Sequence, residues 1–99
     1  MPEETQSTKV TIQNPLGLHM RPAYLLAETA AQFDSKIELV KDDLRIDGKS
    51  PLSILTLGAA QGTELFVEAT GPDAIDAIKT LESLISTGFP EPKSEIEKQ

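Results

Sequence analysis

The chain has 99 residues, with 16 acidic and 9 basic side chains, one histidine and no cysteine. This length is typical of a single domain, and the missing cysteine excludes a disulfide framework, a thiolate metal site and a cysteine nucleophile. A formal net charge of −7 argues against nucleic acid and anionic membranes as partners, because both repel a negative protein. The apolar runs are far shorter than the ~20 residues of a membrane helix. Since the polar start is also unlike a signal peptide, we expect a cytoplasmic protein without membrane insertion.

The first part of the chain predicts a strand followed by a helix. Residues 9–13 alternate between apolar and polar side chains, which is typical of a half-buried strand. The polar residues 1–8 before them are expected to be frayed. From about residue 21 to residue 33, apolar side chains recur at helical spacing. Pro22 suits the first turn of this helix, where a missing N–H group costs nothing.

The middle of the chain predicts a hairpin and a short second helix. Alternation returns in residues 36–40 and 44–46, and two aspartates between them supply the turn. Ser50 and Pro51 are favoured residues at the N-cap and the first position of a helix. That helix should cover residues 51–57 and end near the glycine that follows.

The last part of the chain predicts a strand, a helix and a tail. Residues 64–69 alternate, and apolar side chains recur at helical spacing from residue 74 to a stop near residue 88. The charged, proline-containing residues 89–99 are expected to be disordered. The order βαββαβα, with one apolar face on each strand, predicts an α+β open-faced sandwich in which three helices cover one face of a four-stranded antiparallel sheet. The chain would form one domain, residues 1–99, with its core at about 9–88.

The most informative stretch is Gly17–Ala23, which contains the single histidine of the sequence. His19 stands just before a helix whose first N–H groups lack internal partners and carry the positive end of the helix dipole. An anion placed there would be held by backbone donors, and Arg21 adds a fork of donors suited to phosphate oxygens. An imidazole, with an ordinary pKa of about 6.5, is a nucleophile near neutral pH. The pattern therefore points to a phosphohistidine.

The distribution of charge agrees with an anion at this position. Residues 5–27 and 48–63 contain no carboxylate, whereas Lys9, Arg21 and Lys49 lie within them. If the first and second helices begin on the same side of the sheet, one face of an otherwise acidic protein is free of negative charge. Such a face would attract phosphate or an acidic partner.

The residues alone leave other interpretations of His19 open. It could be a capping or exposed side chain without chemistry, in a small ligand-binding domain of another class. The chain could also be a regulatory module that binds a transcription factor or an enzyme and carries no phosphate. A metal site is not expected, because a lone histidine without cysteine offers no ligand pair at useful spacing, and the sequence implies no cofactor.

Two stretches resemble the histidine-containing phosphocarrier protein family, HPr, of the bacterial phosphoenolpyruvate-dependent phosphotransferase system. Residues 17–23 (GLHMRPA) resemble the phosphorylation motif of that family. Residues 47–50 (DGKS) and 57–65 (LGAAQGTEL) resemble its regulatory-serine region and the loop after it. The resemblance spans about residues 9–88, and the predicted order of elements is also that of the family.

The resemblance implies a phosphocarrier and not an enzyme. His19 would accept a phosphoryl group from enzyme I, which takes it from phosphoenolpyruvate, and would pass it to an EIIA-type acceptor, while Arg21 would contact the phosphoryl group. Partners would dock on side chains around the starts of the first two helices, here Met20, Tyr24, Leu52, Leu55 and Thr56. Nothing in the sequence demands more than a monomer.

Ser50 has two interpretations. It matches the position that an HPr serine kinase/phosphatase modifies in some members of the family, where the phosphate blocks the carrier role. Pro51 departs from the family pattern, which usually has an apolar residue with an N–H group there. A plain helix N-cap, worth about 1 kcal/mol, explains Ser50 as well. A phosphate on Ser50 would act mainly by repelling an acidic partner.

Overall fold

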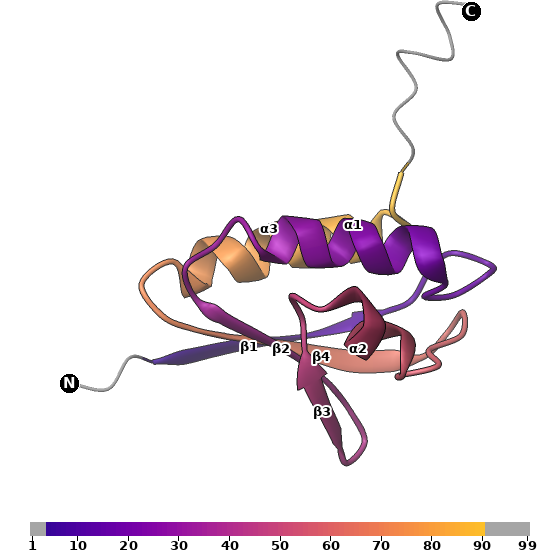
Figure 1. Cartoon of the computed structure of the whole chain (residues 1–99), viewed down its shortest axis with the longest axis horizontal. Helices are drawn as coiled ribbons and strands as arrows, with labels where there is room; N and C mark the ends of the chain where they lie inside the picture. The colour runs from indigo at the N-terminus through magenta and orange to yellow at the C-terminus, as the bar shows by residue number, and fades with distance from the viewer. Residues whose placement is uncertain (1–3, 91–99) are drawn as a thin grey trace, which may run out of the picture.

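The computed structural model describes residues 4–90, which form four strands and three helices in the order predicted from the sequence (Figure 1). The elements are β1 (Thr5–Thr11), α1 (Met20–Ala30), β2 (Lys36–Lys41), β3 (Leu44–Asp47), α2 (Pro51–Leu55), β4 (Glu64–Thr70) and α3 (Ala74–Ser86). In the part of the chain so described, no helix is both long and apolar enough to cross a bilayer.

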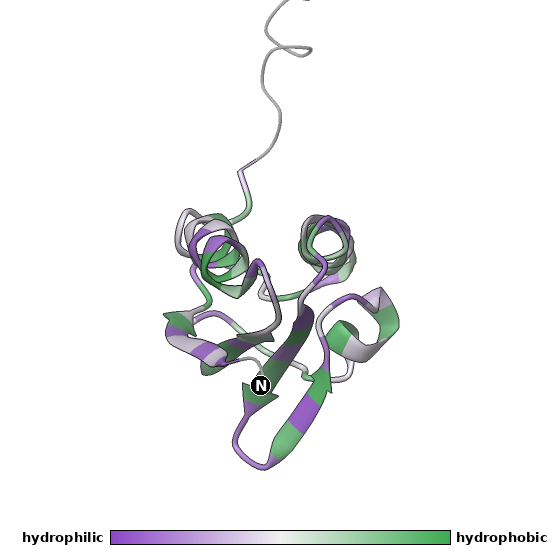
Figure 2. Cartoon of the chain, turned by 90° about the vertical axis from the view of Figure 1, so that its left-hand side faces the viewer, coloured by the Kyte–Doolittle hydropathy of each residue, from purple (hydrophilic) through white to green (hydrophobic). Residues whose placement is uncertain are grey.

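The strands form one sheet in the order β1-β4-β2-β3, and every neighbouring pair is antiparallel. The helices lie on one side of this sheet, and Figure 2 shows the two long helices α1 and α3 side by side above it. The predicted open-faced α+β sandwich is therefore confirmed. The predicted hairpin joins β2 to β3, with Lys41 opposite Leu44, and Asp42 has a φ of 54° in its turn.

The hydrophobic core fills the space between the sheet and the helices. Alternate strand residues such as Val10, Leu39 and Val67 are buried there, and the helices add side chains such as Leu26 and Leu81. Burying one such aliphatic side chain contributes roughly 1.5–3 kcal/mol. This one-sided burial explains why strands with a single apolar face and helices with a single apolar stripe assemble into two layers.

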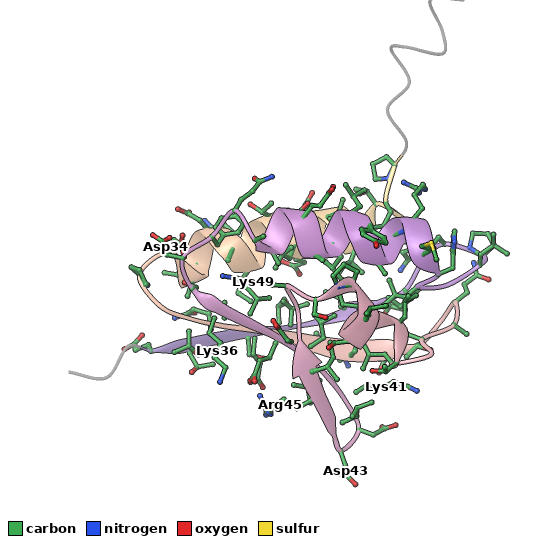
Figure 3. The ribbon with its side chains drawn as sticks, in the orientation of Figure 1. Asp34, Lys36, Lys41, Asp43, Arg45 and Lys49 are labelled. Carbon is green, nitrogen blue, oxygen red and sulfur yellow. The ribbon has the colours of Figure 1, made fainter. Side chains whose placement is uncertain are left out.

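The opposite face of the sheet carries charged side chains. Arg45 of β3 forms ion pairs with Glu38 of β2 and Glu68 of β4, and Figure 3 shows Arg45 and Lys36 on the side away from the long helices. The hydrogen bonds from Arg45 to Glu68 and Glu38 raise the pKa of the guanidinium above its ordinary value. Because Glu38 and Glu68 face each other in the register, Arg45 offsets the repulsion of two like charges.

Both ends of the ordered core differ from the prediction. β1 begins at Thr5 and not at residue 9, because the edge strand pairs with β4 through its backbone, with Thr5 opposite Thr70, and needs no apolar side chains to do so. Phe89 was expected in the tail, but it is completely buried in the core. An aromatic side chain of this size lies inside because it removes a large apolar area from water. The expected disorder of 91–99 concerns residues outside the described part of the chain.

Candidate functional site

A four-residue turn leads from β1 toward α1. The amide of Gly17 donates to the carbonyl oxygen of Asn14 at 2.9 Å, and the side-chain amide of Asn14 donates back to the carbonyl oxygen of Gly17 at 2.5 Å. Asparagine first, Pro15 second and glycine last are the residues that such a turn favours. Gly17 has a φ of 70°, a conformation that a residue without a Cβ adopts at no steric cost.

This turn is pressed against the loop that follows α2. A Cβ on Gly17 would stand 2.4 Å from the carbonyl oxygen of Ala59 and 2.9 Å from the Cα of Ala60. The amide of Leu18 donates to the same Ala59 oxygen at 2.9 Å, and its side chain is buried in the core. The segment that leads to His19 is therefore held in place by the loop after α2 and by the core.

His19 occupies the N-cap of α1 with an extended backbone, at φ −86° and ψ −166°, and its side chain makes no capping hydrogen bond. The residue is exposed, as the sequence predicts. The first intrahelical hydrogen bond runs from the amide of Ala23 to the carbonyl oxygen of His19 at 3.0 Å. The amides of residues 20 and 21 precede that bond, and Pro22 has no amide hydrogen. The exposed ring thus lies at the positive end of a helix dipole.

Arg21 is exposed and is the second residue of the helix, but its side chain is directed at the end of α3. Its Nη2 donates to the carbonyl oxygen of Phe89 at 2.7 Å. This bond uses one of the five N–H donors of a guanidinium, and the phosphate contact of Arg21 stays a prediction.

Apolar side chains are exposed around His19. Met20 and Tyr24 on α1 are 63% and 51% exposed, and Leu52 on α2 is 75% exposed. Leu16, which the sequence analysis did not select, is 77% exposed in the turn before the histidine. Four large apolar side chains in water on neighbouring elements are a feature of a protein-binding surface. The sequence signal that could have identified Leu16 is an apolar residue between two turn-forming residues, Pro15 and Gly17.

The other two predicted docking residues are less accessible or already bonded. Leu55 is partly buried and packs against the core. Thr56 is exposed, and its hydroxyl donates to the carbonyl oxygen of Ser53 at 2.5 Å. The large apolar side chains that are exposed on the candidate docking surface therefore lie on α1, on the turn before it and on the first turn of α2.

The first two helices lie on the same side of the sheet and pack against each other. The loop after α2 contacts the start of α1 through the Leu18–Ala59 hydrogen bond. At the other end, Lys49 Nζ donates to the carbonyl oxygen of Phe33, just beyond the end of α1, at 2.8 Å. α2 therefore lies along α1, with the loop that follows it at the start of α1 and Lys49, just before it, bonded beyond the end of α1.

Ser50 acts as the N-cap of α2, since its hydroxyl oxygen accepts a hydrogen bond from the amide of Ser53 at 3.2 Å. Pro51 occupies the first turn and supplies no N–H group. The predicted capping interaction of Ser50 is therefore present.

The cations of the two carboxylate-free stretches are dispersed. Lys9 pairs with Glu64 at 3.7 Å, and Lys49 is bonded at the far end of α1. Arg21 is therefore the one of the three that lies next to His19 in the described residues. The three cations therefore do not form one broad basic patch. Residues 4–90 contain no group of three or more acidic, histidine or cysteine side chains that could hold a metal ion.

Comparisons with known proteins agree with this geometry. Residues 6–87 match the family described as PTS HPr component phosphorylation site. The chain is 39% identical over 82 residues to phosphocarrier protein HPr of Treponema pallidum, covering 83% of this chain and 93% of that protein. It is 36% identical over 88 residues to phosphocarrier protein NPr of Escherichia coli, covering 88% and 98%.

A solved structure extends the similarity to three dimensions. The crystal structure of HPr from Thermoanaerobacter tengcongensis matches with a TM-score of 0.83 and 39% sequence identity, covering 88% of this chain and 98% of that one. The chain belongs to the HPr family of phosphocarrier proteins of the phosphotransferase system.

Proposed function

We propose that His19 carries the phosphoryl group, accepting it from phosphorylated enzyme I and passing it to an EIIA-type acceptor. The observation that supports this proposal most strongly is the exposed imidazole at the N-cap of α1, with no capping hydrogen bond of its own. A ring that is exposed and makes no capping hydrogen bond is available to react. Its position before two amides and one guanidinium suits it to bear a negatively charged group.

The chemistry needs little beyond positioning. A ring nitrogen of His19 attacks the phosphorus atom, a new N–P bond forms, and the bond from phosphorus to the donor atom of enzyme I breaks with its electron pair returning to the donor. The reverse sequence on the acceptor side releases the group again. Phosphoryl transfer of this kind is accelerated mainly by alignment and by charge stabilisation, which the helix start and Arg21 would supply.

The exposed apolar side chains around the histidine would bind both partners in turn. Met20, Tyr24 and Leu52 lie on two helices that pack together, and Leu16 extends the same surface from the turn. A partner that buries these residues also excludes water from the reacting phosphoryl group. We place the protein in the cytoplasm as a monomer, where enzyme I and the acceptors of the phosphotransferase system would meet it.

A regulatory phosphate on Ser50 is supported less well. The hydroxyl already accepts the amide of Ser53, and Pro51 deprives the helix start of one of the amides that would bind a phosphate there. If an HPr serine kinase/phosphatase does act here, the modification would impede partners through charge next to Leu52. The residue serves first as a cap.

The decisive experiment is incubation with phosphoenolpyruvate and a cognate enzyme I. We expect mass spectrometry to find one added phosphate that is lost in acid and absent from His19→Ala. Adding ATP and the serine kinase, with Ser50→Ala as the control, tests the second modification. An acid-stable adduct, or labelling that persists in His19→Ala, would contradict the proposed carrier role. Partner binding that survives His19→Ala without any labelling of the wild type would indicate a purely regulatory module.

A further inference from the structure

Asn14 connects the turn before α1 to the backbone of the histidine. The carbonyl oxygen of Gly17 accepts two hydrogen bonds, one from Nδ2 of Asn14 at 2.5 Å and one from the amide of His19 at 2.9 Å. The same oxygen therefore links the asparagine side chain to the residue that bears the imidazole. We propose that Asn14 is a positioning residue for phosphorylation of His19, an inference that rests on the carrier function proposed for this histidine.

The orientation of the Asn14 amide is fixed by its surroundings. Turning the amide over would place Oδ1 instead of Nδ2 against the Gly17 oxygen, and two acceptors would then repel each other. In the present orientation Oδ1 is buried and, within residues 4–90, has no hydrogen-bond partner. A buried acceptor without a partner costs free energy. The amide keeps this orientation because Nδ2 then donates to the carbonyl oxygen that also accepts the His19 amide.

The position of His19 depends on this contact because the backbone there is not yet helical. The extended dihedral angles of the N-cap are set by the Gly17 oxygen on one side and by the first helical hydrogen bond, from Ala23, on the other. A rotation of the Gly17 peptide would turn the Cα–Cβ bond of His19 and move the ring away from the helix axis. Small displacements of a reacting group are expensive, since about 1 Å costs up to about 100-fold in rate.

A simpler role for Asn14 is to form the turn, and one substitution separates the two roles. Aspartate is as favourable as asparagine at the first position of such a turn, so a turn-forming residue tolerates Asn14→Asp. An ionised carboxylate cannot donate to the Gly17 oxygen, so a positioning residue does not tolerate it. The neutral pair Asn14→Ser and Asn14→Ala tests the donor without a charge, because serine keeps a donor and alanine removes it, and equal rates in the two would exclude a role for that donor.

Gln61 provides a matched control. Its Nε2 donates to the carbonyl oxygen of Gln13 at 2.9 Å, next to Asn14 in the chain, but that oxygen does not bond to His19. Gln61→Glu therefore removes the same kind of donor from the same loop region and adds the same charge. It leaves the carbonyl that receives the His19 amide untouched.

The experiment measures phosphoryl transfer from phosphorylated enzyme I as a function of carrier concentration, with circular dichroism to verify folding. We expect Asn14→Asp and Asn14→Ala to lower the rate at saturation by about tenfold with little change in the half-saturating concentration, because the docking side chains are unaltered. Asn14→Ser and Gln61→Glu should stay near the wild-type rate. Amide hydrogen exchange at His19 should accelerate in the two slow variants.

The possible results distinguish this inference from the proposed function. Absence of labelling in the wild type refutes the carrier role itself. A labelled wild type with Asn14→Asp at full rate, or with equal losses in Asn14→Asp and Gln61→Glu, overturns the positioning role alone. If Asn14→Asp does not fold, the neutral pair decides, and equal rates for the serine and alanine variants overturn the inference.

Discussion

The side chain of Arg21, the second residue of the first helix, donates a hydrogen bond from Nη2 to the carbonyl oxygen of Phe89, 68 residues further along the chain. Phe89 follows α3, its ring is completely buried, and its φ of 55° turns the backbone sharply. The amide of Phe89 also closes the helix end by donating to the carbonyl oxygen of Leu84 at 3.1 Å. This hydrogen bond joins the first turn of α1 to the segment that ends the last helix.

Arg21 gives the first prediction, which concerns transfer to His19. Arg21→Ala should lower the rate of phosphoryl transfer by about 100-fold, as the loss of one charge-stabilising donor does in other reactions. Arg21→Lys should fall between wild type and alanine, since lysine keeps the charge but lacks the planar fork. Rapid-quench labelling with phosphorylated enzyme I measures the rate. Transfer at the wild-type rate in Arg21→Ala would show that the guanidinium serves only to bind the end of α3.

Gly17 gives a prediction about stability. Gly17→Ala should destabilise the fold by more than the roughly 1–2 kcal/mol of a left-handed alanine, because the new Cβ would also collide with the carbonyl oxygen of Ala59. Gly58→Ala is the matched control, since Gly58 also has a positive φ of 58° but a Cβ there meets nothing within 4 Å. Urea unfolding of both variants gives the difference. Equal losses would mean that the turn and the loop after α2 separate easily.

Asp73 gives a prediction about pH. Its carboxylate accepts hydrogen bonds from the hydroxyl and amide of Ser35 and from the amide of Asp34. The Ser35 hydroxyl first, and the Asp34 amide second, lower the pKa of Asp73 from its ordinary value of 3.8. Because the unfolded chain then takes up the proton more readily, the stability from this group is present above pH 3.8 and is lost as pH falls through the lower folded pKa.

Thermal unfolding between pH 6 and pH 2 measures this effect. Asp73→Asn should remove part of the acid destabilisation of the wild type, because the amide does not titrate. Ser35→Ala should reduce it as well, since the main cause of the lowered pKa is gone. Three identical pH profiles would show that the contact between Asp73 and the loop before β2 contributes nothing to acid unfolding.

Leu52 gives a prediction about partner binding. Leu52→Asp should weaken binding to enzyme I by tenfold or more, an order of magnitude expected when an apolar anchor of an interface is replaced. Leu44→Asp is the control, because Leu44 is also exposed, at 44% against 75% for Leu52, but lies on β3 at the hairpin. Isothermal titration with enzyme I compares the two. A similar loss in both variants would indicate a general effect of negative charge and not a docking surface on α2.

The sequence by itself determined the order of elements and the identity of the chemically interesting stretch. Alternation and helical spacing are local properties, and a sheet with one buried face follows from them without knowledge of distant contacts. The single histidine before a proline-started helix is also a local feature. Its exposure at an N-cap could therefore be predicted, and the structure places it there.

Only the tertiary structure decided the surroundings of that histidine. The contact of Arg21 with Phe89 joins residues that are far apart in sequence, and Phe89 lies in the core because α3 brings it over the sheet. How α2 packs against α1 depends on the path of the chain after β3, which no local pattern encodes. β1 reaches back to Thr5 for a similar reason, since backbone pairing with β4 requires a neighbouring strand and leaves no signature in the side chains.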